Sequence, residues 1–246
     1  MMTSPLIVDA MQVEIGATER WPDDVHLYQP YQVQQMTLPD NASCLSVKTF
    51  LNMSGLKYSL ELRTNAEEMS PSGKVPFIYI PPFIHSGMDP IVAAVNTRGF
   101  SLSESLNDTE RSELRAYMVM IENILVTKPR YGSIHPWPIN LIIPWQKQRS
   151  IKAKLEAKGW ADKSLEQVYD EVKTCCQALS ERLQDQEYFF GDKPTELDAM
   201  VFGHLYTLLT TNLPDIDLAI IIRNYGNLAN FCKRVEIKYF REIEED

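Results

Sequence analysis

The sequence predicts an α+β fold, with elements of the α/β type, in which a small mixed-sheet domain is followed by an all-helical domain. The first hundred residues alternate between strand and helix patterns, as in sheets that helices cover. After Ser101 the chain consists of long runs with apolar residues three and four positions apart. A Val75-Pro76 dipeptide opens an apolar strand after a Gly-Lys loop. We therefore expect an N-terminal extension over residues 1–22, a sheet domain over 23–100 and a helical domain over 101–246.

Two strand-like segments begin the sheet domain. The first strand is expected over Val25–Tyr31. The second is expected over Lys57–Arg63, where Tyr58, Leu60 and Leu62 alternate with polar residues and should point inward.

A helix is predicted between these strands, over Cys44–Met53. Its N-cap should lie within Asp40–Ser43, because Asp, Asn and Ser are favoured caps, and Gly55 stands where a C′ glycine ends a helix. Ser43 and Cys44 would then lie at the helix N-terminus, where the helix dipole and free N–H groups favour a thiolate.

The Val75-Pro76 strand is followed by a short strand at Phe83-Ile84 and by a helix over Asp89–Arg98 that Gly99 ends. This order of elements, with a proline before the third strand, resembles that of thioredoxin-like domains. The resemblance implies a cis Val75–Pro76 bond, which presents the backbone N–H and C=O of Val75 to an extended ligand, usually glutathione. An ordinary edge-strand proline is the alternative.

The second half contains three predicted helices, over Asp108–Thr127, over Leu165–Leu183 and after Thr195. The last has little polar face, which indicates burial. Thr195 and Asp198 have the spacing of a capping box, in which each side chain binds the backbone N–H of the other residue. A helical domain of this kind after a thioredoxin-like half resembles the glutathione-transferase fold.

Individual segments carry a more specific resemblance. The sequence resembles the metaxin family, and within it the paralogue without a C-terminal membrane anchor, in the runs LPDNASCLSVKTFL, NAEEMSPSGKVPFI, RYGSIHPWPIN, CCQALSERL and YFFGDKPTELDAMVFGHLYTLLTTNL. The family has more chain between Thr127 and Arg130 than this sequence has.

The resemblance implies a non-enzymatic scaffold subunit of the mitochondrial outer-membrane sorting and assembly machinery, which imports and inserts β-barrel proteins. It implies a peripheral protein on the cytosolic face, associated with the membrane only indirectly. The implied partners are an anchored metaxin paralogue in a heterodimer, the β-barrel insertion subunit and precursor proteins. Two other roles stay open: an active glutathione transferase or glutathione-binding protein, and an adaptor that links mitochondria to motor-based transport.

The residues that a glutathione site requires are only partly present. Val75-Pro76 keeps the cis-proline position, and Lys74 could bind a glycyl carboxylate, although a solvated surface lysine is the alternative. Asp89-Pro90 stands where glutathione transferases have Glu/Gln-Ser, so a hydroxyl and an N–H are lost and a negative charge is added. Cys44 fits no CxxC pattern and is expected to be a buried, inert thiol. We interpret five residues as a degenerate glutathione site without a catalytic group: Cys44, Val75, Pro76, Asp89 and Pro90.

Other chemistries find no support in the sequence. The histidines are scattered, at His26, His85, His135 and His204, and the vicinal pair Cys175-Cys176 would point to different faces of a helix. Zinc-ligand spacing and Gly-rich phosphate loops are both missing from the sequence. We therefore expect no metal and no cofactor, and His204 on the apolar helix should be a core histidine.

Charge narrows the choice of partners. A net charge of −9 argues against nucleic acid and against direct adhesion to anionic lipid. The first twenty residues contain Asp9, Glu14 and Glu19 against one Arg20, unlike a matrix presequence. Apolar stretches such as Leu218–Ile222 are too short to span a bilayer.

Two segments are candidate interfaces. Trp137 lies in an aromatic run, and Trp and Tyr are frequent in interaction hot spots. A basic helix with a few apolar positions is a candidate for an acidic partner or for lipid contact, although a solvated helix face is the alternative. Its cations are Lys147, Arg149, Lys152, Lys154 and Lys158.

Overall fold

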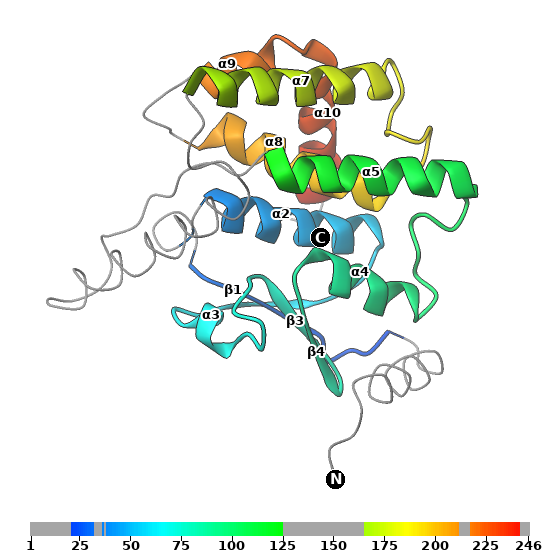
Figure 1. Ribbon diagram of the computed structural model, residues 1–246. Coiled ribbons are helices and arrows are strands. Elements are labelled where there is room, and N and C mark those ends of the chain that lie inside the picture. The colour runs from blue at the N-terminus through cyan, green and yellow to red at the C-terminus, as the bar shows by residue number, and fades with distance from the viewer. Residues whose placement is uncertain (1–20, 32–35, 37, 125–164, 212–216, 242–246) are drawn as a thin grey trace, which may run out of the picture.

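The computed structural model describes residues 21–31, 36, 38–124, 165–211 and 217–241, which form a sheet layer and a helical layer (Figure 1). The expected fold class is confirmed. Helix α2 (Leu38–Met53) lies between the sheet and helix α8 (Glu196–Thr210), so these two helices join the layers.

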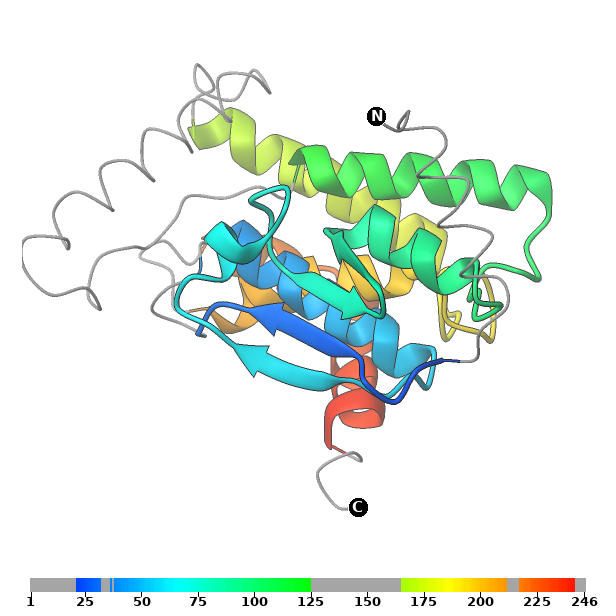
Figure 2. The same cartoon turned by 90° about the horizontal axis from the view of Figure 1, so that it is seen from below.

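The sheet has four strands in the order β2-β1-β3-β4. β1 (His26–Gln29) pairs parallel with β2 (Ser59–Leu62) and antiparallel with β3 (Phe77–Ile80), which pairs antiparallel with β4 (Phe83–Ser86). Figure 2 views the sheet from the side away from α2, with β2 at one edge.

The inward orientation expected for β2 is wrong for Leu60. Leu60 lies opposite the fully buried Leu27 of β1, yet its side chain is 41% exposed. Leu62 is only half-buried. Because β2 pairs on one side alone, its residues lack the neighbours that bury the central strands.

The Val75–Pro76 bond is cis, as the sequence predicts. A second cis bond, Pro81–Pro82, lies in the two-residue turn between β3 and β4, where Ile80 pairs with Phe83. Cis proline is typical of such tight turns. This second bond was not among the features expected from the sequence.

The N-terminal boundary predicted for α2 is wrong. The helix spans Leu38–Met53, so the run Asp40–Ser43, expected to cap it, lies within the helix. Pro39 in the first turn is the signal that indicates the earlier start, because the first helical residues need no N–H donor. Two further helices flank the strands, α3 (Ala66–Met69) and α4 (Met88–Asn96).

The helical layer surrounds α8. It contains α5 (Asp108–Ile124), α7 (Leu165–Leu183), α9 (Asp217–Arg223), α10 (Gly226–Glu236) and the π-helical turn η1 (Ile237–Arg241). All but three residues of α8 are buried, which explains why its sequence shows almost no polar face.

Helices α2 and α8 approach each other through small residues. The hydroxyl of Ser46 donates to the backbone oxygen of Ala42 at 2.8 Å and lies 3.5 Å from that of Met200. Gly203 faces the same turn of α2, and a Cβ there would lie 2.6 Å from the nitrogen of Ser46 and 2.7 Å from the oxygen of Ala42. Only a residue without a side chain fits at position 203.

The start of α8 is fixed by a buried carboxylate. Asp198 and Thr195 form the predicted capping box. Asp198 accepts hydrogen bonds from the backbone N–H of Phe189 at 2.9 Å, and from the N–H and hydroxyl of Thr195 at 2.8 and 2.7 Å. Burial raises the pKa of Asp198 from 3.8 to about 6, although these hydrogen bonds favour the ionised form.

The raised pKa of Asp198 predicts a pH-dependent stability. Its native pKa, about 6, lies above the unfolded value of 3.8, so between these values the native state holds a proton that the unfolded chain has lost. The free energy of unfolding should therefore fall as the pH rises through this window, by up to about 3 kcal/mol from this group. Urea unfolding across the window should show a flatter profile for Asp198→Asn, and parallel profiles would contradict the assignment.

The C-terminal turn is tied to the sheet layer. The side-chain amide of Asn52 in α2 donates to the backbone oxygen of Tyr239 at 2.9 Å, and the hydroxyls of Tyr188 and Tyr239 are 3.0 Å apart. Lys238 donates to the hydroxyl of Tyr188 at 2.9 Å. The first of these bonds holds η1 against α2, and the other two hold it against Tyr188, in the segment before α8.

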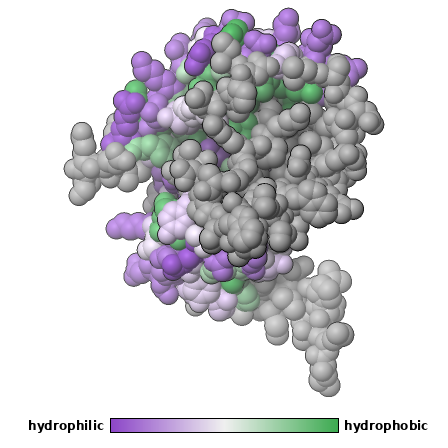
Figure 3. All heavy atoms as spheres, turned by 90° about the vertical axis from the view of Figure 1, so that its left-hand side faces the viewer, coloured by the Kyte–Doolittle hydropathy of each residue, from purple (hydrophilic) through white to green (hydrophobic). Residues whose placement is uncertain are grey.

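The described surface on the side shown in Figure 3 is mostly hydrophilic, with small, separate hydrophobic areas. No helix within the described ranges combines the length and hydropathy that crossing a membrane requires. The same residues contain no group of three or more His, Cys, Asp or Glu side chains suited to hold a metal ion.

Candidate functional site

The candidate site is the junction between the start of β3 and the start of α4. The backbone N–H of Gly87, the N-cap of α4, donates to the oxygen of Pro76 at 3.0 Å. Gly87 has a φ of 84°, which disfavours any residue with a side chain. The hydroxyl of Ser70 donates to that of Ser86 at 3.1 Å beside this junction. These contacts hold the cis proline against the helix N-terminus.

Cys44 lies beneath this junction and is not at a helix N-terminus, which corrects the expected placement of Ser43 and Cys44. Its side chain is 2% exposed, in a buried cluster with Val75 and Phe77. Burial, reinforced by the negative charge of Asp40, raises the pKa of the Cys44 thiol well above its ordinary value. Cys44 is therefore held as a protonated thiol and lacks the thiolate that attack on an electrophile requires.

Asp89 and Pro90 occupy the first turn of α4, and both are exposed. Pro90 contributes no N–H to this helix end, and Asp89 places a carboxylate there. Lys74 is exposed on the loop before β3, and its Cδ lies 3.8 Å from where a Cβ on Gly87 would be. The helix end that would attract a ligand carboxylate thus carries a negative charge of its own.

The histidines do not gather at this junction. His26 pairs with Asp24 at 2.6 Å on β1, and His204 is buried on α8. His85 on β4 is half-buried, and burial followed by the nearby charge of Arg98 lowers its pKa. His135 lies outside the described residues.

Other predicted features also lie outside the described residues. These are the segment between Thr127 and Arg130, which is expected to be shorter than in the family, and the candidate interface residues Trp137, Lys147, Arg149, Lys152, Lys154 and Lys158. A pocket between α4 and α5 was not expected from the sequence, because its arginines on α5 follow the ordinary pattern of a solvated helix face.

Family models match both halves of the chain. A model described as the glutathione S-transferase N-terminal domain matches residues 42–131, and one described as the glutathione S-transferase C-terminal domain matches residues 172–235. The protein therefore has the glutathione-transferase fold, with a cis proline at position 76 and with Asp89 and Pro90 at the start of α4.

Curated relatives narrow the class. Metaxin-2 of Mus musculus is 45% identical over 254 residues, which cover 96% of this chain and 97% of the relative. The Metaxin-2 homolog of Caenorhabditis elegans is 36% identical, over 83% of this chain and 95% of the relative. Metaxin-1 of Mus musculus is 28% identical, over 80% of this chain and 69% of the relative. The chain belongs to the metaxin family.

Solved structures agree on the fold at low sequence identity. Glutathione transferase GSTFuA3 from Phanerochaete chrysosporium matches with a TM-score of 0.59 and 14% identity, over 89% of this chain and 98% of that chain. A glutathione transferase family member from Pseudomonas fluorescens with two glutathione bound matches with a TM-score of 0.55 and 16% identity. The match covers 91% of this chain and 92% of that chain.

The altered helix end predicts a result for glutathione binding. The double substitution Asp89→Glu with Pro90→Ser should create a measurable heat of glutathione binding, because it restores a hydroxyl and a backbone N–H at the start of α4. Cys44→Ser is the control and should create none, because Cys44 is buried. Tight glutathione binding by the unmodified protein in the same calorimetric titration would contradict the interpretation.

Proposed function

We propose that this protein is a non-enzymatic scaffold subunit of the mitochondrial outer-membrane sorting and assembly machinery, acting in the import and insertion of β-barrel proteins. It works in a heterodimer with an anchored metaxin and contacts the β-barrel insertion subunit and precursor proteins. The observation that carries the proposal is the 45% identity to Metaxin-2 over 96% of the chain.

The junction around Pro76 supports a role without catalysis. Catalysis of glutathione transfer needs an activated group near the cis proline and a helix end that accepts the glutathione carboxylate. The cysteine that lies there, Cys44, is buried and protonated, and the helix end carries Asp89 and Pro90. The protein keeps the transferase fold, but Cys44 does not meet the first requirement, and Asp89 and Pro90 do not meet the second.

The proposed location is the cytosolic face of the outer membrane, where the protein is peripheral. Its hold on the membrane is indirect, through the anchored metaxin. A net charge of −9 supports this arrangement, because a strongly acidic protein is repelled by anionic lipid and needs a partner to stay near it.

Affinity capture of the tagged protein from outer membranes in mild detergent, followed by mass spectrometry, tests the proposal. Recovery of an anchored metaxin together with the β-barrel insertion subunit is the expected result. A parallel passage over glutathione resin is the control, and no retention is expected. Retention on the resin without those partners would overturn the scaffold function.

The cis Val75–Pro76 bond and the transferase fold favour a second candidate, a glutathione-binding protein. The resin arm of the same experiment separates the two functions. If motor proteins are captured instead of the insertion subunit, the protein is an adaptor for mitochondrial transport.

A further inference from the structure

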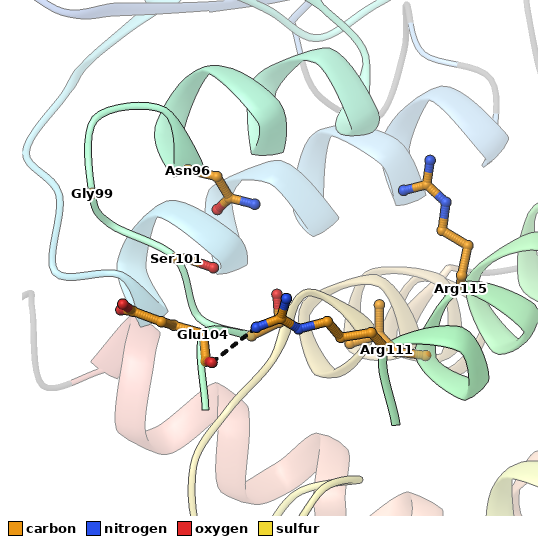
Figure 4. A pocket seen from close by; sticks show the side chains of 8 residues that line it. Asn96, Gly99, Ser101, Glu104, Arg111 and Arg115 are labelled. Atoms are coloured by element: carbon orange, nitrogen blue, oxygen red, sulfur yellow. Dashed lines mark hydrogen bonds between the residues drawn. The ribbon is translucent and has the colours of Figure 1, made fainter. Parts of the chain in front are cut away.

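A pocket of about 440 Å³ lies between the end of α4 and the first half of α5 (Figure 4). This volume is within the range of small-molecule sites. The pocket is separate from the junction around Pro76, since it adjoins the opposite end of α4. The lining groups used below are Asn96, Ser101, Ser103, Glu104, Arg111 and Arg115.

Two arginines on one side of α5 supply the positive charge. Arg111 and Arg115 are four residues apart, so their side chains leave the helix as neighbours. The guanidinium group of Arg111 donates to the backbone oxygen of Glu104 at 3.0 Å and makes no ion pair within the described ranges. Arg115 has no hydrogen-bond or ion-pair partner among the same residues.

Three other arginines of the protein pair with carboxylates, while Arg234, among the described residues, donates only to the backbone oxygens of Gln186 and Glu187. Arg63 pairs with Glu61 at 2.8 Å, Arg182 with Glu113 at 2.9 Å and Arg241 with Glu236 at 2.9 Å. Arg111 and Arg115 have no such partner in the described part of the chain, and they differ from Arg234 in that both line one pocket.

Two carboxylates at the pocket, those of Glu104 and Glu196, do not pair with these cations. In Figure 4 the carboxylate of Glu104 points away from the guanidinium group of Arg111, which reaches the backbone oxygen of Glu104 instead. The hydroxyl of Ser103 donates a hydrogen bond to the buried carboxylate of Glu196 at 2.9 Å. Ser103 therefore holds that carboxylate in place and is not a donor to a ligand.

Neutral groups complete the donor set. The hydroxyl of Ser101 lines the pocket without a partner among the residues that the structure describes, and the side-chain amide of Asn96 points toward the pocket in Figure 4. Only the amide nitrogen Nδ2 of Asn96 can donate to an anion, whereas its oxygen Oδ1, which is buried and makes no hydrogen bond with those residues, can only accept. Two guanidinium groups, a hydroxyl and an amide thus line one space, together with Gly99, Leu114 and the exposed Glu104.

We propose that this pocket binds an oxyanion, the phosphate or carboxylate group of a small polar ligand, through Arg111 and Arg115. Guanidinium groups bind the oxygens of both anions in pairs, with shorter and stronger hydrogen bonds than neutral donors make. Ser101 and Asn96 orient the ligand. The site goes beyond the proposed scaffold function and does not depend on it.

Titration calorimetry on the full chain tests the site with inorganic phosphate and, separately, with succinate, at constant ionic strength. Arg111→Gln and Arg115→Gln should each weaken binding of the preferred probe about tenfold, which is about 1.4 kcal/mol. Arg223→Gln is the matched control, because this exposed arginine ends α9, away from the pocket, and its loss removes the same charge. Backbone NMR shifts should place the probe at Gly99 and Ser101.

The two probes distinguish the sources of the oxyanion: saturation by phosphate alone indicates a phosphorylated ligand, and saturation by succinate alone a carboxylic acid. Either result supports the site if the two pocket variants weaken binding and Arg223→Gln does not. An absence of saturable binding by both probes would overturn the proposal. So would an equal loss in Arg223→Gln, which would indicate general charge attraction, or unchanged binding in both pocket variants.

Discussion

The substitution Gly203→Ala should lower the free energy of unfolding by about 3 kcal/mol, at the upper end of the cost of overpacking a core. A Cβ at this position would lie 2.6 and 2.7 Å from backbone atoms of Ser46 and Ala42. These are main-chain atoms of a helix that is itself packed on the sheet, so they cannot turn aside as a flexible side chain would. The expected loss exceeds the gain of about 1 kcal/mol that Ala normally brings to a helix interior.

Urea unfolding of matched variants checks this expectation. Gly226→Ala is the control, because Gly226 is the first residue of α10 and a Cβ there would meet no atom within 4 Å, so its effect should stay within about 0.5 kcal/mol. Adding Ser46→Ala to Gly203→Ala should restore only part of the stability, since the backbone contacts remain. Equal stability of the two glycine variants would show that α2 and α8 can move apart at little cost.

Asp198→Ala should lower the free energy of unfolding by about 4 kcal/mol, because hydrogen bonds to a charged group are among the stronger ones and their buried donors would be left unpaired. The substitution removes the acceptor for the N–H of Phe189 and for the N–H and hydroxyl of Thr195. The start of α8 and the turn before it should both loosen, so amide exchange should accelerate at Phe189 and Thr195.

Asp108→Ala is the matched control for Asp198→Ala. Asp108 also lies in the first turn of a helix, but it is exposed, so its loss should cost less than about 1 kcal/mol. The loss of unfolding free energy for Thr195→Ala should lie between those for Asp198→Ala and Asp108→Ala. This substitution removes one of the three donors and leaves the carboxylate bonded to two N–H groups. A loss for Asp198→Ala no larger than that for Asp108→Ala would contradict the role of the buried carboxylate.

Local chemistry made part of this structure predictable. The capping box follows from the three-residue spacing of Thr195 and Asp198, and the burial of α8 from its lack of a polar face. The bounds Leu165–Leu183 of α7 coincide with the prediction. The cis Val75–Pro76 bond was predictable only through the order of the surrounding elements, because an isolated Val-Pro is usually trans.

The errors arose where tertiary contacts or competing signals decide the outcome. The start of α2 was misplaced because Asn41 and Ser43 are good caps in isolation, while Pro39 two residues earlier already opens the helix. The exposure of Leu60 depends on which strand is at the edge of the sheet, which its alternating pattern does not reveal. The need for glycine at position 203 depends on a helix far away in the sequence.

At the candidate site, too, features set by residue type were predictable, and features set by tertiary contacts were not. The exposed Asp89-Pro90 pair could be identified from residue types, since proline removes an N–H wherever it stands. Cys44 was expected to be a buried, inert thiol, but the residues that bury it could not be identified from the sequence, because they belong to several elements. The pocket beside Arg111 was hidden for a related reason, as its walls come from α5 and from the chain that follows α4.

The contact between α2 and α8 affects how the chain can fold during its synthesis. Ser46 and Met200 are 154 residues apart, and Asn52 and Tyr239 are 187 residues apart. During translation the N-terminal half therefore leaves the ribosome long before the helix that covers α2 exists. At elongation rates of roughly 5–20 residues per second, α2 stays uncovered for on the order of ten seconds. Until α8 is synthesised, the sheet half exposes the apolar face of α2 that α8 later covers, which is the kind of surface that leads to aggregation. A ribosome stalled before residue 196 would hold a chain that cannot complete its core.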